Sequence, residues 1–303
     1  KSRWGGMMRE IESSDFEAAN IEYIEFWLMD PFTEDVDNKG DLYINLGEIS
    51  EDILKDGRKS YENGLPTSAI VENVDTTIWG RIPSLQALVE SFSSAGGSRE
   101  FQDVGYDGLM TEDERTWYDN TYLDVIRSKY GANSKAFTDA ESDPSSDNYH
   151  YFRGGDYDQQ AEYSSVTERY KKFNNSDGNS PTDAQNPEAY PTAATNLPNI
   201  EDINRDNTLS ESERYFQYKI ELDPTKMEVG SNYITDVFEA KDIKLANGDL
   251  TSVHWYQFKI PVQNPDNVIG NISDFRSIRF MRMFMKDFER PIVARFATFE
   301  LVR

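Results

Sequence analysis

The sequence predicts a mainly β protein in which an N-terminal and a C-terminal part together build one β-sandwich. Alternation of apolar and polar residues, which is typical of half-buried strands, occurs in residues 1–98 and again in residues 211–303. Residues 99–210 differ in character from both ends, being rich in Asp, Ser, Asn and Pro. Because the early strands need partners to bury their apolar faces, we expect the two ends to meet in a jelly-roll, galactose-binding-like sandwich, with residues 99–210 as an insertion.

The first part contains two clear strand patterns. Alternation predicts a strand over Ile21–Met29 and a second over Leu42–Gly47. Ser84 is a suitable N-cap for a helix over Leu85–Phe92, whose apolar residues lie on one stripe. The pair Gly5–Gly6 indicates a turn.

We expect the insertion to be largely irregular and helical. A helix is predicted from Thr111 to about Lys129, because apolar residues recur there at helical spacing. Between Asp139 and Asn199 the prolines and small polar residues make regular structure improbable. The tyrosines of that stretch favour irregular chain packed on a surface over a flexible connector.

Strand patterns return in the last part. Alternation predicts strands over Phe216–Leu222, Tyr256–Val262, Ser277–Met285 and Pro291–Val302. Between the first two of these, the spacing over Ile234–Ala240 predicts a short helix.

Composition excludes several classes of function. The net charge is −24, so nucleic acid and anionic membrane surfaces are poor partners, whereas divalent cations are attracted. The chain has no cysteine and two histidines, which excludes thiolate metal sites and disfavours histidine-dependent catalysis. No nucleophile–base motif, phosphate loop or dinucleotide fingerprint is present, and we expect no enzyme activity. No apolar run is long enough for a membrane-spanning helix. The chain starts at Lys1 without a signal peptide, and we expect it to be a segment of a longer protein.

A twelve-residue stretch that begins at Asp202 has the ligand spacing of an EF-hand calcium loop. Such loops use oxygen ligands at positions 1, 3, 5, 7, 9 and 12. These positions fall on Asp202, Asn204, Asp206, Thr208, Ser210 and Glu213. Asn207 stands at position 6, which needs positive φ, and Leu209 is an apolar anchor at position 8.

A second stretch, which begins at Asp103, matches the same pattern less fully. Its ligand positions carry Asp103, Asp107, Leu109 and Glu114, with Leu109 contributing its backbone carbonyl. Gly108 suits the sharp turn, but Gly105 supplies no side-chain oxygen at position 3. We therefore predict Ca²⁺ at the Asp202 loop and a weaker or ligand-borrowing site at the Asp103 loop. Magnesium fits less well because it prefers fewer protein ligands.

The predicted calcium has a structural role. The Asp202 loop leads almost directly into a strand pattern, and the Asp103 loop has no predicted helix before it, so neither resembles half of a paired EF-hand sensor that opens on binding calcium. The clustered carboxylates would repel one another without a cation, so bound calcium would stabilise the irregular acidic segments.

Two groups of apolar residues leave alternatives open. Exposed aromatic side chains on a calcium-bearing sandwich can stack on sugar rings, so a calcium-dependent carbohydrate-binding module is the alternative function. The tryptophans that could do this are Trp27, Trp79, Trp117 and Trp255. Met281, Met283 and Met285 alternate on one side of a predicted strand, where they form either buried packing or a soft docking surface.

Several long and unusual strings stand out in the sequence: Arg3–Arg9, Asn20–Phe32, Gly40–Gly47, Ile49–Lys59, Asp103–Leu109, Arg169–Asn175, Gly178–Thr182 and Arg279–Met285. Together they resemble the SprA/Sov family of cell-surface proteins from Bacteroidetes. The resemblance implies a segment of the very large outer-membrane β-barrel of the type 9 secretion system, which exports folded cargo and supports gliding motility. It offers no catalytic motif.

The resemblance also implies partners and a location. The partners would be secretion-system components, secreted cargo proteins or the rest of the same outer-membrane barrel. We expect the segment at the cell surface on the extracellular side of the outer membrane, with the periplasm as the other possibility.

Overall fold

The computed structural model describes residues 4–32, 37–52, 70, 72–78, 80–84, 107–145, 157–170, 201–245 and 247–303. The chain divides into two compact units. The first joins Lys1–Ile49 to Ser212–Arg303, and the second is Ser50–Glu211. The boundary that the sequence predicts at residue 98 differs from this division, in which the second unit begins at Ser50.

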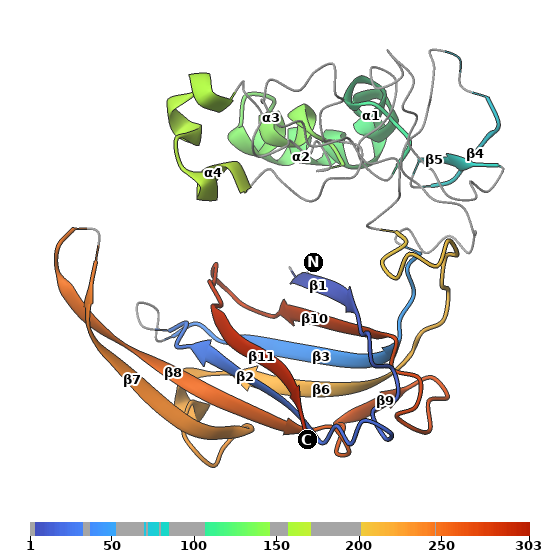
Figure 1. The fold of residues 1–303 in the computed structure, drawn as a ribbon. Coiled ribbons are helices and arrows are strands. Elements are labelled where there is room, and N and C mark those ends of the chain that lie inside the picture. The colour runs from blue at the N-terminus through green and yellow to red at the C-terminus, as the bar shows by residue number, and fades with distance from the viewer. Residues whose placement is uncertain are drawn as a thin grey trace. The chain divides into compact units, whose positions relative to one another are not determined.

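The first unit consists of two antiparallel sheets, each built from both ends of the chain (Figure 1). The five-stranded sheet has the order β1 (Trp4–Glu10), β10 (Phe280–Lys286), β3 (Gly40–Glu48), β6 (Arg214–Leu222) and β9 (Asn267–Ile269). The four-stranded sheet has the order β11 (Phe296–Val302), β2 (Tyr23–Met29), β8 (Leu250–Pro261) and β7 (Ile234–Lys244). The mainly β, antiparallel character predicted from the alternation is therefore confirmed.

One hydrophobic core joins the two sheets. It is built from the alternating apolar residues that the sequence pattern picks out, including Ile24, Phe26 and Leu28 of β2, Leu42, Ile44 and Leu46 of β3, Phe216, Tyr218, Ile220 and Leu222 of β6, and Phe258 and Ile260 of β8. The ring of Phe26 stacks on those of Phe258 and Phe299, each at a centroid distance of 5.1 Å. The methionines of β10 pack against this core in a half-buried state.

The strand β3 shows how the two ends of the chain complete each other. It lies between β10 and β6, both of which come from the C-terminal part. Glu48 at its end faces Arg214 of β6 in register, and the two side chains form a paired ion contact with N–O distances of 2.6 and 2.7 Å.

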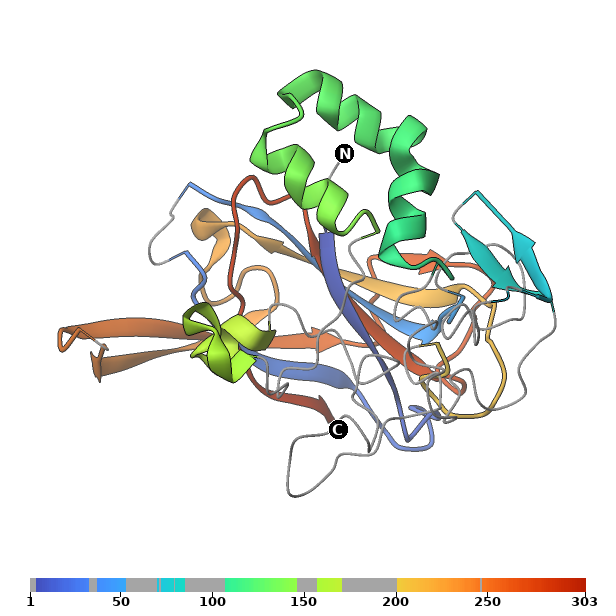
Figure 2. The ribbon, with the colours of Figure 1, turned by 90° about the horizontal axis from the view of Figure 1, so that it is seen from above.

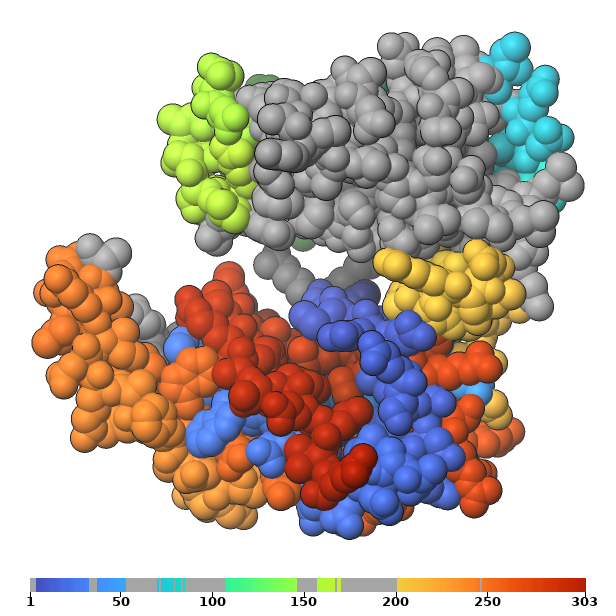
Figure 3. All heavy atoms as spheres, viewed as in Figure 1, coloured from blue at the N-terminus to red at the C-terminus, as the bar shows by residue number. Residues whose placement is uncertain are grey.

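Two predictions for the first unit are wrong. The helix predicted over Ile234–Ala240 is the edge strand β7, whose pairing with β8 shifts register twice and whose residue Asp242 has a φ of +57°. These irregularities break the two-residue alternation that would have identified a strand. The turn predicted at Gly5–Gly6 is instead part of β1. The β7–β8 hairpin projects beyond the other strands of this unit (Figures 1 and 3).

The second unit is mainly helical in its described part. The predicted helix from Thr111 is confirmed, as α1 (Thr111–Tyr118), a π-helical turn (Asp119–Leu123) and α2 (Asp124–Tyr130). After α2 the chain turns into α3 (Lys135–Ser142), as Figure 2 shows. The remaining elements are the short strands β4 (Val74–Thr76) and β5 (Arg81–Pro83), two 3₁₀ turns (Tyr157–Gln159 and Ala161–Tyr163) and α4 (Val166–Tyr170). The first unit has a further 3₁₀ turn, Pro224–Lys226. The helix predicted over residues 85–92 lies outside the described residues.

None of the helices in the described parts of the chain combines the length and the apolar character needed to cross a membrane.

Candidate metal centre: two acidic loops

The Asp202 loop is held in shape by its own acidic side chains. One oxygen of Asp202 accepts a hydrogen bond from the backbone N–H of Asp206 (3.0 Å), and the other accepts from Asn207 (3.1 Å). Asn204 caps the N–H of Asp206 at 3.1 Å, and Asp206 in turn caps the N–H of Thr208 at 2.9 Å. The contacts of Asn204 and Asp206 are Asx turns, which Asp and Asn form because their short side chains reach backbone groups two residues further on. The contacts of Asp202 reach residues four and five positions further on. The first four predicted ligand positions therefore lie in one continuous turn.

The predicted turn residue and apolar anchor of this loop take the expected states. Asn207 has a φ of +62°, the left-handed conformation expected at position 6. Leu209 is buried, with 5% of its surface exposed. Ser210, at position 9, contributes its backbone to a contact with another part of the same unit.

That contact is made by Glu51, which the sequence reasoning missed as a site residue. The carboxylate of Glu51 accepts hydrogen bonds from the backbone N–H groups of Ile203 (2.8 Å) and Ser210 (3.2 Å). Its own N–H donates to the carbonyl oxygen of Ser210 at 2.7 Å. No local pattern marks this residue, because its partners lie 152 and 159 positions away in the chain. Glu51 fixes both ends of the loop from outside.

Burial controls the electrostatics of these acids. Desolvation raises the pKa of Glu51, and the hydrogen bonds from Ser210 and Ile203 partly oppose it. Desolvation also raises the pKa of Asp202, against the hydrogen bonds from Asn207 and Asp206. Because burial disfavours the charged form of a carboxylate, a nearby cation would stabilise both groups as anions.

Glu213, the predicted position-12 ligand, has a different partner. It belongs to the first unit, where its two carboxylate oxygens accept hydrogen bonds from the guanidinium of Arg282. This ion pair would have to open before Glu213 served a metal ion.

The second loop repeats part of the first. Asp107 at position 5 accepts the N–H of Leu109 at 3.0 Å, which is the same turn that Asp206 makes with Thr208. Gly108 has a φ of +64°, and a Cβ there would lie 2.5 Å from the carbonyl oxygen of Arg81. Only glycine meets both requirements without strain. Asp103 and Gly105 lie outside the described residues.

Two predicted ligands of the second loop converge on one residue. Asp107 accepts a hydrogen bond from the hydroxyl of Ser145, and Glu114 accepts one from the N–H of Ser145 at 3.1 Å. Both residues are almost completely buried, with exposed fractions of 4% for Asp107 and 1% for Glu114. Desolvation raises the pKa of Asp107, and burial together with the charge of Asp107 raises the pKa of Tyr118, whose hydroxyl donates to Asp107 at 3.2 Å.

The chemistry of the first loop fits a hard cation in part. Its side chains offer carboxylate and amide oxygens, which calcium prefers. Thr208 occupies position 7 of the sequence pattern, where an EF-hand loop uses a backbone carbonyl as a ligand. Among the described residues, however, no three His, Cys, Asp or Glu side chains are grouped so that they could hold a metal ion. The predicted metal sites therefore stay predictions.

Two of the four candidate sugar-binding tryptophans lie on one surface. In the four-stranded sheet, Trp27 of β2 pairs with Gln257 of β8, and the next outward pair is Met29 with Trp255. Both tryptophans are half-buried and alternate with core residues, so they share the sheet face that points away from the core. Trp117 lies on α1 of the other unit, and Trp79 lies outside the described residues.

Comparison with protein families identifies a match. Residues 121–303 fit the family model SprA_N, whose description is "Motility related/secretion protein". This range includes all of the strands from β6 to β11 and the acidic Asp202 loop. A search of curated proteins found no match.

Proposed function

The chain belongs to the SprA family of motility-related and secretion proteins, and we propose that it is a non-catalytic structural or interaction segment of the outer-membrane translocon of the type 9 secretion system. The observation that carries this proposal is the family match over residues 121–303. The resemblance of the N-terminal strings to the same family extends the relationship to β1, β2 and β3.

The proposal gives the segment a cell-surface location and protein partners. The partners are other components of the secretion machinery, secreted cargo or the rest of its own outer-membrane barrel. The strongly acidic composition supports protein or cation partners over nucleic acid. The two antiparallel sheets around one core support a sandwich of the jelly-roll type as the scaffold.

Calcium is the second element of the proposal. The Asp202 loop would hold the ion through Asp202, Asn204, Asp206, the carbonyl of Thr208 and Ser210. Two features support this role: the hydrogen bonds that hold the side chains of Asp202, Asn204 and Asp206 in one turn, and the positive φ of Asn207. Bound calcium would stabilise the acidic turn from Asp202 to Ser210 within the second unit.

The role in secretion is tested by crosslinking in intact cells. A photo-reactive residue in place of Phe238, which is 58% exposed on the β7–β8 hairpin, should capture a secretion component or an exported protein. The same residue in place of the exposed Glu228 is the control for random capture. Equal capture at the two positions, or the absence of any secretion partner, contradicts the proposal.

A second candidate function, carbohydrate binding, is favoured by the shared face of Trp27 and Trp255. Aromatic rings on neighbouring strands can form a platform on which sugar rings stack. Titration with oligosaccharides while following tryptophan fluorescence distinguishes the two functions. A saturable change that Trp255→Ala removes would support carbohydrate binding, and an unchanged signal would leave the secretion role as the better account.

A further inference from the structure

Four methionines lie on one face of the strand pair β1–β10. In the antiparallel register, Met7 of β1 is directly opposite Met283 of β10, and Met281 and Met285 stand two residues to either side of Met283. Residues two apart in a strand share a face of the sheet, so the four thioethers are on the same side. They are half of the eight methionines in the chain, which has no cysteine. This face therefore gathers much of the sulfur that the chain can offer as a ligand.

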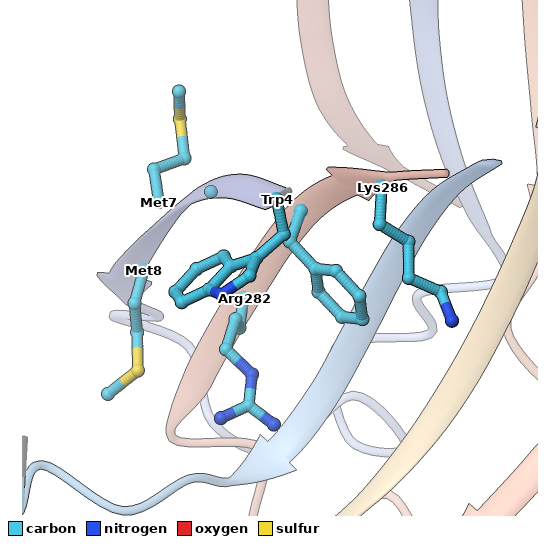
Figure 4. A pocket seen from close by; sticks show the side chains of 7 residues that line it. Trp4, Met7, Met8, Arg282 and Lys286 are labelled. Atoms are coloured by element: carbon cyan, nitrogen blue, oxygen red, sulfur yellow. The ribbon is translucent and has the colours of Figure 1, made fainter. Parts of the chain in front are cut away.

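The methionines stand where the hydrophobic core gives way to solvent. On its other side, Met283 is opposite Ile44 of β3, which is completely buried. Met283 itself is half-buried, and Met7, which continues this row at the edge of the sheet, is 66% exposed. Figure 4 shows that the side chains of Met7 and Met8 leave β1 in opposite directions. A methionine can fill a gap in a core, but the thioether of Met7 is too exposed to serve that purpose.

Three of the four thioethers line one small hollow. Its volume is about 180 Å³, and Met7, Met283 and Met285 are among the residues around it. Gly5 is opposite Met285, and a Cβ added to Gly5 would meet no atom within 4 Å, so space is left beside the thioether of Met285. The other described residues that line the hollow are glycine, alanine, leucine and phenylalanine. Sulfur is therefore the side-chain ligand atom that this hollow presents.

The spacing of the three side chains suits one shared ion. Cβ atoms of a directly opposed pair are roughly 5 Å apart, and residues two apart along a strand are separated by roughly 7 Å. The centre of such a triangle lies about 4 Å from each Cβ. A methionine sulfur is two bonds beyond Cβ, and a metal–sulfur bond adds about 2.3 Å. Three thioethers can therefore meet at one ion without any movement of the strands.

Thioethers select soft metal ions. Methionine and cysteine sulfur favours Cu⁺, whereas Ca²⁺ and Mg²⁺ take oxygen ligands. Thioethers are neutral and do not compensate the charge of the ion, so an apolar hollow favours a monovalent cation over a divalent one. The net charge of −24 attracts cations to the chain as a whole. These properties together indicate monovalent copper.

From these observations we propose that Met7, Met283 and Met285 form a binding site for one Cu⁺ ion. Two of the ligands come from β10, inside the five-stranded sheet, and the third comes from the edge strand β1. The bound ion would link these two strands and slow the opening of β1. The site shares no residue with the Asp202 loop, so its test is independent of the calcium test.

Ag⁺ and Cu⁺ are the probes. Ag⁺ shares the soft character of Cu⁺ and stays in one oxidation state in air. Its binding to the whole chain is measured by titration calorimetry in chloride-free buffer, with Ca²⁺ in large excess to occupy carboxylates. Cu⁺ is kept reduced by ascorbate without oxygen, and its affinity is measured by competition with the chelator bicinchoninate. X-ray absorption at the copper edge identifies the ligand atoms, and hydrogen exchange follows β1.

One ion should bind per chain, with a dissociation constant of about 10 μM or below, and excess Ca²⁺ should not displace it. X-ray absorption should show sulfur neighbours at about 2.3 Å. Amide exchange in β1 should become slower when the ion is bound.

Met7→Leu should weaken binding by at least about tenfold. Because Met7 is exposed, this variant should keep the melting temperature of the unmodified protein. Met283→Leu combined with Met285→Leu should abolish saturable binding. Met227→Leu is the matched control, because Met227 is also half-buried against the same core but lies outside this cluster. The control should bind the ion as the unmodified protein does.

Three results would overturn the proposal. The first is binding that Met7→Leu and the double variant leave unchanged, which would mean an adventitious ion only. The second is displacement of Ag⁺ by Ca²⁺, because the ion would then lie on carboxylates. The third is one ion for every two chains, because the exposed Met7 would then bridge two copies.

Discussion

Both carboxylate oxygens of Glu213 are occupied by the guanidinium of Arg282, with N–O distances of 2.9 and 3.2 Å. The same guanidinium lies over the ring of Tyr215, 5.0 Å from its centre. A paired Arg–carboxylate contact is among the stronger ion pairs, because two hydrogen bonds act together. The residue that the EF-hand pattern assigns to the last calcium position is therefore committed to a contact with the strand β10.

Glu213→Gln is accordingly expected to change the calcium dependence of stability only slightly. The substitution should lower the free energy of unfolding by up to about 1 kcal/mol, the usual range for a partly exposed ion pair, equally with calcium and with EDTA. Melting curves of both proteins in both solutions measure this. If the difference between calcium and EDTA disappears in the variant, Glu213 leaves Arg282 to bind the ion.

Asp206→Ala is expected to remove most of the effect of calcium. In the unmodified protein, EDTA should lower the melting temperature by roughly 5–10 °C if calcium is present at about a hundred times its dissociation constant. Asp223→Ala is a matched control, because Asp223 accepts the N–H and hydroxyl of Thr225 just as Asp206 accepts those of Thr208. The control should keep its response to EDTA. A response that survives Asp206→Ala would exclude the Asp202 loop as the calcium site.

Acid should weaken the contact between β3 and β6. The hydrogen bonds and charge of Arg214 lower the pKa of Glu48 below its ordinary value of 4.5. Because the folded state holds this carboxylate charged, its contribution to stability is present above pH 4.5 and is lost as the pH falls through the lower, folded-state pKa. Glu48→Gln should therefore lower the free energy of unfolding by up to about 1 kcal/mol at pH 7. In acid, where Glu48 itself is protonated, the variant and the unmodified protein should be equally stable. Urea unfolding from pH 7 down to pH 3 should show the two proteins converging, and parallel curves would contradict this assignment.

Gly108→Ala should destabilise the second unit. The new Cβ would meet the carbonyl of Arg81 at 2.5 Å and would also require positive φ. We expect a loss of about 2 kcal/mol or more, since a steric conflict adds to the backbone strain of about 1 kcal/mol. Gly131→Ala isolates the strain alone, because Gly131 has a φ of +89° and open space around the added atom. Hydrogen exchange of α1 and α2 reports on this unit, and equal effects of the two substitutions would show that the close approach is unimportant.

Strands with one buried face were predictable from the sequence. In β2, β3 and β6 every second side chain enters the core, so burial imposes the alternation that identifies a strand. In β1 and in most of β7 both faces are exposed, so burial imposes no pattern. β7 also places Ile234, Val237 and Phe238 at helical spacing, and its register shifts disguise the strand further.

The acidic loops show the same division between local and distant information. The turns at Asp206, Asn207 and Gly108 depend on local features, namely a hydrogen bond to a residue two positions away and residue types that tolerate positive φ. The structure has these turns as the sequence indicates. The contacts of Glu51 with Ile203 and Ser210, and of Glu213 with Arg282, join residues far apart in the chain. No local pattern encodes those pairings, because each depends on tertiary structure that brings distant segments together.

The position of β3 between β10 and β6 has a consequence for biosynthesis. Its nearest partner in the sequence begins 166 residues after Glu48. At ribosomal speeds of about 5–20 residues per second, a newly made β3 waits roughly 10–30 s before β6 emerges, and longer for β10. During that delay no strand from the C-terminal part covers the apolar face of β3. A chaperone that holds the nascent polypeptide would therefore protect this segment until β6 and β10 have been synthesised.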